Sequence, residues 1–99
     1  MPKPCFRVRD EIAWRKMKDG TVTIVSPIVE KIISINKTAG MVWELLDGNR
    51  TVDAIVDVLH EQFRKEGVTR ATIEDDVREI LNSFVERQLV EQIVDSAHA

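Results

Sequence analysis

Hydrophobic and polar residues alternate along the first third of the chain, and this alternation predicts β-strands. Between Val8 and Met17 the apolar residues fall on one side and charged residues occupy the other. The dipeptide Asp19-Gly20 follows, which is typical of a hairpin turn because both residues tolerate a positive φ. We therefore predict a strand over Val8–Met17 and a returning strand over Thr21–Val25.

A third strand is predicted over Lys31–Ile35, a second run rich in β-branched residues. Pro27 separates it from the preceding strand, because a proline ends a strand or places it at a sheet edge. The first third of the chain is thus expected to form a small three-stranded antiparallel sheet. If the outer side of the third strand is unpaired, another chain can add to it as a further strand. The alternative is that the N-terminus or a dimer mate covers this edge.

Apolar residues recur at helical spacing from residue 36 onwards, and we expect three helices. The first is short, with Asn36 as its N-cap and Gly48 at its end. The second follows Thr51 as its N-cap and runs from Val52 to about Lys65 with its apolar residues on one face. The third begins at Thr72, where Asp75 three residues later resembles a capping box.

Three strands followed by three helices describe an α+β fold with a winged helix-turn-helix-like shape. The chain has 99 residues, which fits a single domain over 1–99 with an ordered part over about residues 6–94. Residues 89–94 are rich in apolar side chains, and they either extend the third helix or form a short terminal strand.

The composition favours a soluble globular protein, with 43% hydrophobic and 31% charged residues. No apolar run approaches the roughly 18 residues that a membrane span needs. The N-terminal segment also lacks the apolar stretch of a signal peptide. We therefore expect a cytoplasmic protein without a membrane partner.

No catalytic or metal-binding pattern stands out in the sequence. Cys5 is the single cysteine, and no base lies near it to activate the thiol. His60 has Asp57 and Glu61 as neighbours on one helix, which is not a recognised metal spacing. Neither a glycine-rich phosphate loop nor a nucleophile elbow is present. We expect a protein that is not an enzyme, has no metal site and uses no cofactor.

A winged-helix shape also raises the alternative of a DNA-binding transcription regulator. The predicted third helix, however, carries five acidic residues against two arginines, a net charge of −3 that repels phosphates. The basic N-terminal segment lacks the clustered aromatic residues of a single-strand-binding surface. We therefore expect no nucleic-acid partner. A homodimerising structural domain, in which the exposed third strand pairs with its mate, is a further alternative.

Several short runs resemble the PqqD-like family. Ile33–Ala39 is similar to the family's strand ending in Leu-Asn followed by Thr-Ala. Val42–Gly48 resembles its Ile-Trp-x-Leu-Leu-Asp-Gly run, and Thr51–Val52 with Ile55–Val56 resembles its Thr-Val and Ile-Val pairs. The resemblance covers about Val8–Glu91.

This resemblance implies a winged-helix-like fold that recognises ribosomally made, post-translationally modified peptides. The family's founding member presents a precursor peptide to a radical S-adenosylmethionine (radical SAM) enzyme during pyrroloquinoline quinone (PQQ) synthesis. In related recognition elements the leader peptide adds as a strand to the third strand and lies against the third helix. The implied partners are a precursor (leader) peptide and a radical SAM or other peptide-modifying enzyme. The implied peptide-binding residues are Lys31, Ile32, Ile33, Ser34, Ile35, Arg78, Leu81, Asn82 and Val85.

The residues that carry the resemblance are expected to be structural. Trp43 and Leu46 are large apolar residues at helical spacing, and such residues normally pack into a core. The chain departs from the family at Arg87–Leu89, where many members have a glycine near the end of the third helix.

Overall fold

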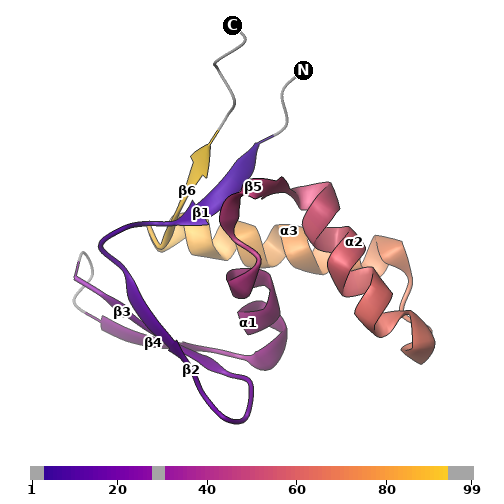
Figure 1. Ribbon diagram of the computed structural model, residues 1–99, viewed down its shortest axis with the longest axis horizontal. Helices are drawn as coiled ribbons and strands as arrows, with labels where there is room; N and C mark the ends of the chain where they lie inside the picture. Colours follow the sequence, from indigo (N-terminus) through magenta and orange to yellow (C-terminus); the bar gives the residue numbers. More distant parts are fainter. Residues whose placement is uncertain (1–3, 28–30, 94–99) are drawn as a thin grey trace, which may run out of the picture.

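The computed structural model describes residues 4–27 and 31–93, which form two three-stranded antiparallel sheets and three α-helices (Figure 1). This arrangement confirms the α+β class. No helix within these ranges is both long and apolar enough to cross a membrane. The strands are β1 Cys5–Val8, β2 Ala13–Lys16, β3 Val22–Ser26, β4 Lys31–Ile35, β5 Asp47–Thr51 and β6 Val90–Ile93. The helices are α1 Lys37–Glu44, α2 Val52–Phe63 and α3 Arg70–Glu86, with a 3₁₀ turn over Arg64–Glu66 after α2.

The first sheet has the order β2-β3-β4 and contains the predicted hairpin. Met17 N donates to Thr21 O at 2.8 Å, and Gly20 has φ +93°. The Asp19 carboxylate closes the turn, because its Oδ1 accepts from Thr21 N at 3.0 Å. β3 and β4 pair with Ile24 opposite Ile33, which leaves β4 at the edge of the sheet.

The second sheet has the order β5-β1-β6, and it corrects the prediction of one continuous strand over Val8–Met17. That prediction was wrong because the chain changes sheets between β1 and β2. Arg9 N donates to Leu89 O at 3.1 Å and Ile12 N donates to Arg9 O at 3.0 Å, which forms a turn there. Cys5 therefore lies in a strand and is half-buried.

The other two strands of this sheet come from later parts of the chain. β5 occupies Asp47–Thr51, where only a turn and a helix start were expected. The sequence left open whether residues 89–94 extend the third helix or form a short strand. Val90–Ile93 is a strand, β6, and it pairs with β1. Residue 94 lies outside the described residues.

Side-chain caps set the start of each helix. Asn36 Oδ1 accepts from Ala39 N at 2.8 Å, as predicted for an N-cap. Thr51 caps α2 in the same way, through Ala54 N at 3.2 Å. Thr69 caps α3, so this helix begins at Arg70 and the predicted start at Thr72 was wrong.

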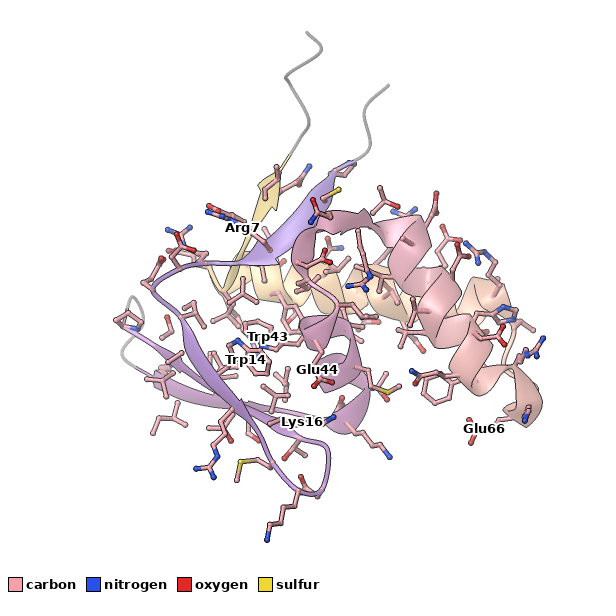
Figure 2. The ribbon with its side chains drawn as sticks, in the orientation of Figure 1. Arg7, Trp14, Lys16, Trp43, Glu44 and Glu66 are labelled. Atoms are coloured by element: carbon pink, nitrogen blue, oxygen red, sulfur yellow. The ribbon has the colours of Figure 1, made fainter. Side chains whose placement is uncertain are left out.

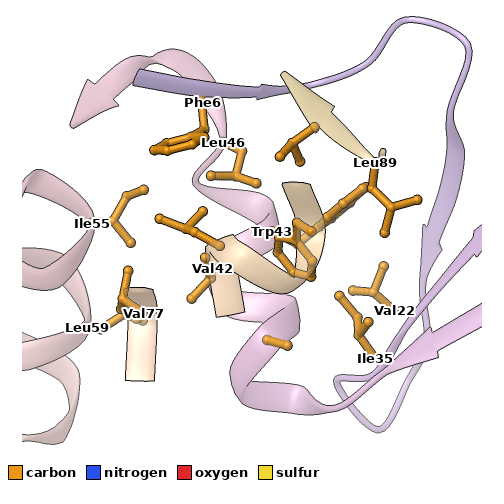
Figure 3. Close-up of a cluster of buried hydrophobic side chains, with 14 of the residues drawn as sticks. Phe6, Val22, Ile35, Val42, Trp43, Leu46, Ile55, Leu59, Val77 and Leu89 are labelled. Atoms are coloured by element: carbon orange, nitrogen blue, oxygen red, sulfur yellow. The ribbon is translucent and has the colours of Figure 1, made fainter. Parts of the chain in front are cut away.

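Trp43 lies at the centre of the hydrophobic core, which joins both sheets to the helices (Figure 3). Its side chain is 1% exposed, and Leu46 is also buried, so the prediction that both residues pack inward is confirmed. Gly40 lets α1 approach the β2-β3 hairpin, because a Cβ there would lie 3.0 Å from Val22 Cγ2 and 3.1 Å from Gly20 O. The core thereby fixes α1 and α3 against the inner face of the sheet that ends in β4.

Candidate functional site

The free edge of β4 is the first component of the candidate site. β3 pairs with one side of β4, and within residues 4–27 and 31–93 no strand pairs with the other. Ile32 is 75% exposed and Ser34 is also exposed, whereas Ile35 turns into the core. An exposed edge of this kind presents backbone N–H and C=O groups to any extended chain that approaches it.

A cleft of about 510 Å³ lies between the C-terminal end of β4, the start of α1 and one face of α3. Its volume is within the range of about 300–1,000 Å³ that is typical of ligand sites. Apolar side chains contribute to the lining beside polar ones. The lining residues are Ser34, Ile35, Asn36, Thr38, Ala39, Asp76, Glu79, Ile80, Ser83, Phe84 and Arg87.

Charge is distributed unevenly along this cleft. Asp76 and Glu79 lie near the middle of α3, whereas Arg87 is the C-cap at its end. Glu79 and Arg87 are eight residues apart, which corresponds to about 12 Å along a helix. All three side chains are exposed, and none has an ion-pair partner among the described residues. The cleft is therefore acidic at one end and basic at the other.

The aromatic floor of the cleft connects it to the core. Phe84 lines the cleft and packs edge-on against Trp43, with ring centroids 5.2 Å apart. Trp14 also lies edge-on to Trp43, with ring centroids 6.1 Å apart (Figure 2). The indole Nε1 of Trp43 is buried and has no hydrogen-bond partner within the described part of the chain.

Two carboxylates, those of Asp76 and Glu79, line the cleft. Among the described residues no three His, Cys, Asp or Glu side chains lie close enough together to bind a metal ion. The ion pair between Arg7 and Glu91 joins β1 to β6, and the Glu91 carboxylate raises the pKa of Arg7. That pair belongs to the second sheet rather than to the lining of the cleft.

Comparison with known proteins agrees with this geometry. The family model described as "Coenzyme PQQ synthesis protein D (PqqD)" matches residues 21–90. The chain belongs to the PqqD family. The PqqA binding protein of Kluyvera intermedia is 32% identical over 88 residues, which cover 89% of this chain and 88% of that protein.

Two solved structures share the fold. TbiB1 in complex with the TbiA(beta) leader peptide gives a TM-score of 0.75 at 21% identity, covering 86% of this chain and 94% of that one. The PqqD truncation of Methylobacterium extorquens PqqCD, described as a stand-alone recognition element for ribosomally synthesised and post-translationally modified peptides, gives 0.70 at 22% identity, covering 87% of each chain. The two sheets and three helices thus form the PqqD-type fold.

The structure brings together only part of the predicted site. Ser34 and Ile35 line the cleft, and Lys31–Ile33 continue the same strand beyond it. Ile33 is half-buried opposite Ile24.

The predicted residues of α3 do not line the cleft. Leu81 is 3% exposed and packs in the core. Arg78 pairs with Glu74 at 3.0 Å, one turn back along the same helix. Asn82 and Val85 are exposed outside the cleft.

Sequence reasoning missed the polar residues on the opposite flank of α3. Asp76, Glu79, Ser83 and Arg87 recur at spacings of three and four, beside the apolar stripe. This periodicity marks one helix face, but either flank of the stripe satisfies the same pattern. Only the packing of α3 against the sheet identifies the flank that faces β4.

A left-handed residue lies within Arg87–Leu89, where the resemblance to the PqqD-like family led us to expect a departure. Gln88 has φ +59° and directly follows the end of α3. Leu89 N donates to Phe84 O at 3.0 Å and Gln88 N donates to Val85 O at 3.0 Å, which is the Schellman pattern. Glycine is favoured at this position, so Gln88 keeps the same helix end at some conformational cost.

Proposed function

We propose that this chain is a noncatalytic peptide-binding module that binds the leader of a ribosomally made precursor peptide and presents it to a modifying enzyme. The observation that carries the proposal is the free edge of β4 beside the cleft formed with α3. The curated relative from Kluyvera intermedia, named as a PqqA binding protein, supports the choice of a peptide as ligand.

Binding by strand addition separates affinity from selectivity. Backbone groups of β4, which has five residues, hydrogen-bond to an extended peptide whatever its sequence. Alternate side chains of an added strand point to the same face, so every second peptide residue meets the cleft. There, the half-buried Ile80 offers an apolar contact above the buried ring of Phe84, and the charged residues select among peptides.

We place the peptide contacts on β4 and on the cleft-lining face of α3. Lys31, Ile32, Ile33, Ser34 and Ile35 supply the edge, and Leu81 supports the helix from the core. Arg78, Asn82 and Val85 stay predictions without a place in the cleft. The helix contacts are Asp76, Glu79, Ile80, Ser83, Phe84 and Arg87.

The modifying enzyme is also part of the proposal. The PqqD family implies a radical SAM enzyme in PQQ synthesis or a related pathway. A chain that holds its ligand by backbone pairing leaves the far side of the peptide open, so an enzyme can act on the attached core segment. Neither catalysis nor a cofactor of its own is needed for this role.

An NMR titration tests the proposal. A synthetic PqqA peptide, the ligand named for the relative from Kluyvera intermedia, is added to the ¹⁵N-labelled protein while backbone amide shifts are followed. We expect perturbations along Lys31–Ile35 and along the α3 residues that line the cleft. A titration in which these amides do not move contradicts the proposal.

Pairing with a second copy of the chain is the competing use of the same edge. Ile32 is 75% exposed and lies opposite Val25, which is 47% exposed, so the outer face near the edge is apolar. Sedimentation equilibrium distinguishes peptide binding from self-pairing. A chain that is monomeric without peptide has a free β4 edge, whereas a dimer that dissociates when peptide is added uses the same edge for its partner copy.

A further inference from the structure

A second hollow opens at the end of the cleft, between α1, α2 and α3, and we call it the side pocket. Its volume is about 240 Å³. Two carboxylates, those of Glu66 and Asp76, lie at its polar rim, and Thr38 completes the rim. Its apolar wall consists of Leu59, Phe63, Val68, Ile73, Val77 and Ile80.

The side pocket adjoins the cleft. Thr38, Asp76 and Ile80 line both. β4 ends at Ile35 and α1 begins at Lys37, so the side pocket lies beyond the C-terminal end of β4. A peptide that extends along β4 and past this end reaches the mouth of the side pocket.

The size of the side pocket suits one side chain. Its volume is below the range of about 300–1,000 Å³ that holds a drug-sized molecule. Leu59, Ile73 and Val77 form its floor, and they are 2%, 5% and 0% exposed. The floor is therefore part of the packed core, and the cavity is preformed rather than opened by the ligand.

The rim of the side pocket is acidic. Glu66 stands at the turn between α2 and α3 (Figure 2), and Glu79 lies one turn along α3 from Asp76. The two arginines nearest to Glu66 and α3's start already have ion-pair partners. Arg64 pairs with Glu61 at 3.2 Å, and Arg70 pairs with Asp57.

No lysine or arginine lines the side pocket. The side chain of Lys37, next to Thr38 in sequence, lies over Gly20 on another side of α1. Within the described part of the chain neither Glu66 nor Asp76 has an ion-pair partner. A cation brought by the ligand would therefore meet carboxylates that are not already paired.

We propose that the side pocket anchors one bulky aliphatic or aromatic side chain of the bound peptide, while Glu66 and Asp76 hold a lysine or arginine beside it. The inference rests on the proposed function and adds a contact beyond the edge of β4. Antiparallel pairing is the more stable kind, and it places the N-terminal end of the added strand at the C-terminal end of β4. The apolar–basic pair then precedes the strand-forming segment of the peptide.

A peptide display selection on the full chain tests the anchor. Random peptides of about 15 residues span β4 and continue past it at about 3.3 Å per residue. We expect selected peptides to share a bulky apolar residue next to a lysine or arginine, N-terminal to the segment that pairs with β4. Replacing the apolar anchor of a selected peptide by alanine should weaken binding about 10- to 100-fold.

Two substitutions in the protein, rather than in the peptide, test the side pocket. Val68→Trp fills it from the loop before α3, and Glu66→Lys reverses an exposed rim charge without touching the core. Both should weaken binding of the anchor-bearing peptide about tenfold. Val68→Trp should leave the alanine-substituted peptide less affected, whereas Glu66→Lys should weaken it as well, because that peptide keeps its basic residue. Changing the basic residue of the peptide to glutamate should restore affinity for Glu66→Lys. Gln62→Trp, which adds the same bulk outside the side pocket, should bind normally.

The outcomes separate the anchor from the proposed function. If no peptide binds, or if bound peptides leave the amide signals of β4 unchanged, the proposed function fails and the anchor fails with it. If peptides bind along β4 without a shared apolar–basic pair, or if both pocket variants bind them as tightly as the wild type, the anchor is refuted while the proposed function stands.

Discussion

Phe84 packs edge-on against Trp43, with ring centroids 5.2 Å apart and an interplanar angle of 87°. Both rings are buried, and Phe84 also lines the cleft, so a ligand in the cleft would change the surroundings of a tryptophan that does not line it. We expect peptide binding to change the emission of Trp43. Titration of a Trp14→Phe variant, which retains Trp43 as its single tryptophan, checks this. An unchanged spectrum at saturating peptide would contradict it.

Blocking the cleft should weaken peptide binding without unfolding the protein. Ser83 is half-buried and lines the cleft, whereas Asn82 is exposed and lies outside it. Ser83→Trp is therefore expected to weaken peptide binding at least about tenfold, which corresponds to roughly 1.4 kcal/mol. Asn82→Trp adds the same side chain one residue away and should bind within about twofold of wild type. Isothermal titration calorimetry of both variants provides the comparison, and equal affinities would place the ligand elsewhere.

Adding a methyl group at Gly40 should destabilise the protein. Alanine favours a helix over glycine by up to about 1 kcal/mol, but its Cβ would meet Val22 Cγ2 at 3.0 Å and the backbone oxygen of Gly20 at 3.1 Å. Overpacking of this kind costs typically about 1–3 kcal/mol. We expect Gly40→Ala to lower the free energy of unfolding by about 1–2 kcal/mol, measured by urea denaturation. A variant as stable as wild type would show that α1 moves away from the hairpin freely.

Glycine at position 88 should stabilise the protein. Gln88 has φ +59°, a conformation that costs a residue with a Cβ about 1–2 kcal/mol. Glycine removes this cost but makes the unfolded chain more flexible, which offsets about 0.4–1 kcal/mol. Gln88→Gly should therefore raise the free energy of unfolding by up to about 1 kcal/mol, and Gln88→Val should lower it. Thermal unfolding of the wild type and both variants ranks their stabilities. A Gln88→Val variant that is more stable than Gln88→Gly would refute this explanation.

Acid should weaken the turn that leads into β5. Backbone N–H groups of Asn49 and Arg50, together with the Arg50 guanidinium, hold the pKa of Asp47 below its ordinary value of 3.8. Since the folded-state pKa is lowered, the stabilisation is present above the unfolded-state pKa and is lost as pH falls through the folded-state value. We expect Tm to fall below about pH 4 less steeply in Asp47→Asn than in wild type. The prediction is contradicted if Tm depends on pH in the same way in both proteins between pH 2 and pH 7.

Local patterns predicted the elements that depend on local chemistry. The bounds of β4, the hairpin at Asp19-Gly20 and the caps at Asn36 and Thr51 all follow from residues within a few positions of each other. Each of these features is set by backbone conformation or by a side chain that reaches its own turn.

Features set by distant pairing were not predictable in the same way. Cys5 pairs with Ile93 on one side and Thr51 on the other, so neither alternation nor propensity near β1 reveals its sheet. The same holds for the cleft: the stripe on α3 was recognised, but the rotation that turns Glu79 rather than Arg78 toward β4 results from packing against Trp43 and the sheet.

The pairing of β1 with β6 determines how this domain can be joined to other proteins. Cys5 lies directly opposite Ile93, so the first and last strands leave the fold side by side, at the end of the molecule remote from β4 (Figure 1). A second domain attached before β1 or after β6 would be joined at this end of the fold rather than at β4. Covalent tethering would replace a bimolecular encounter by a high effective concentration, set by the length of the linker. The topology thus permits the same recognition unit to operate free or as one segment of a larger polypeptide.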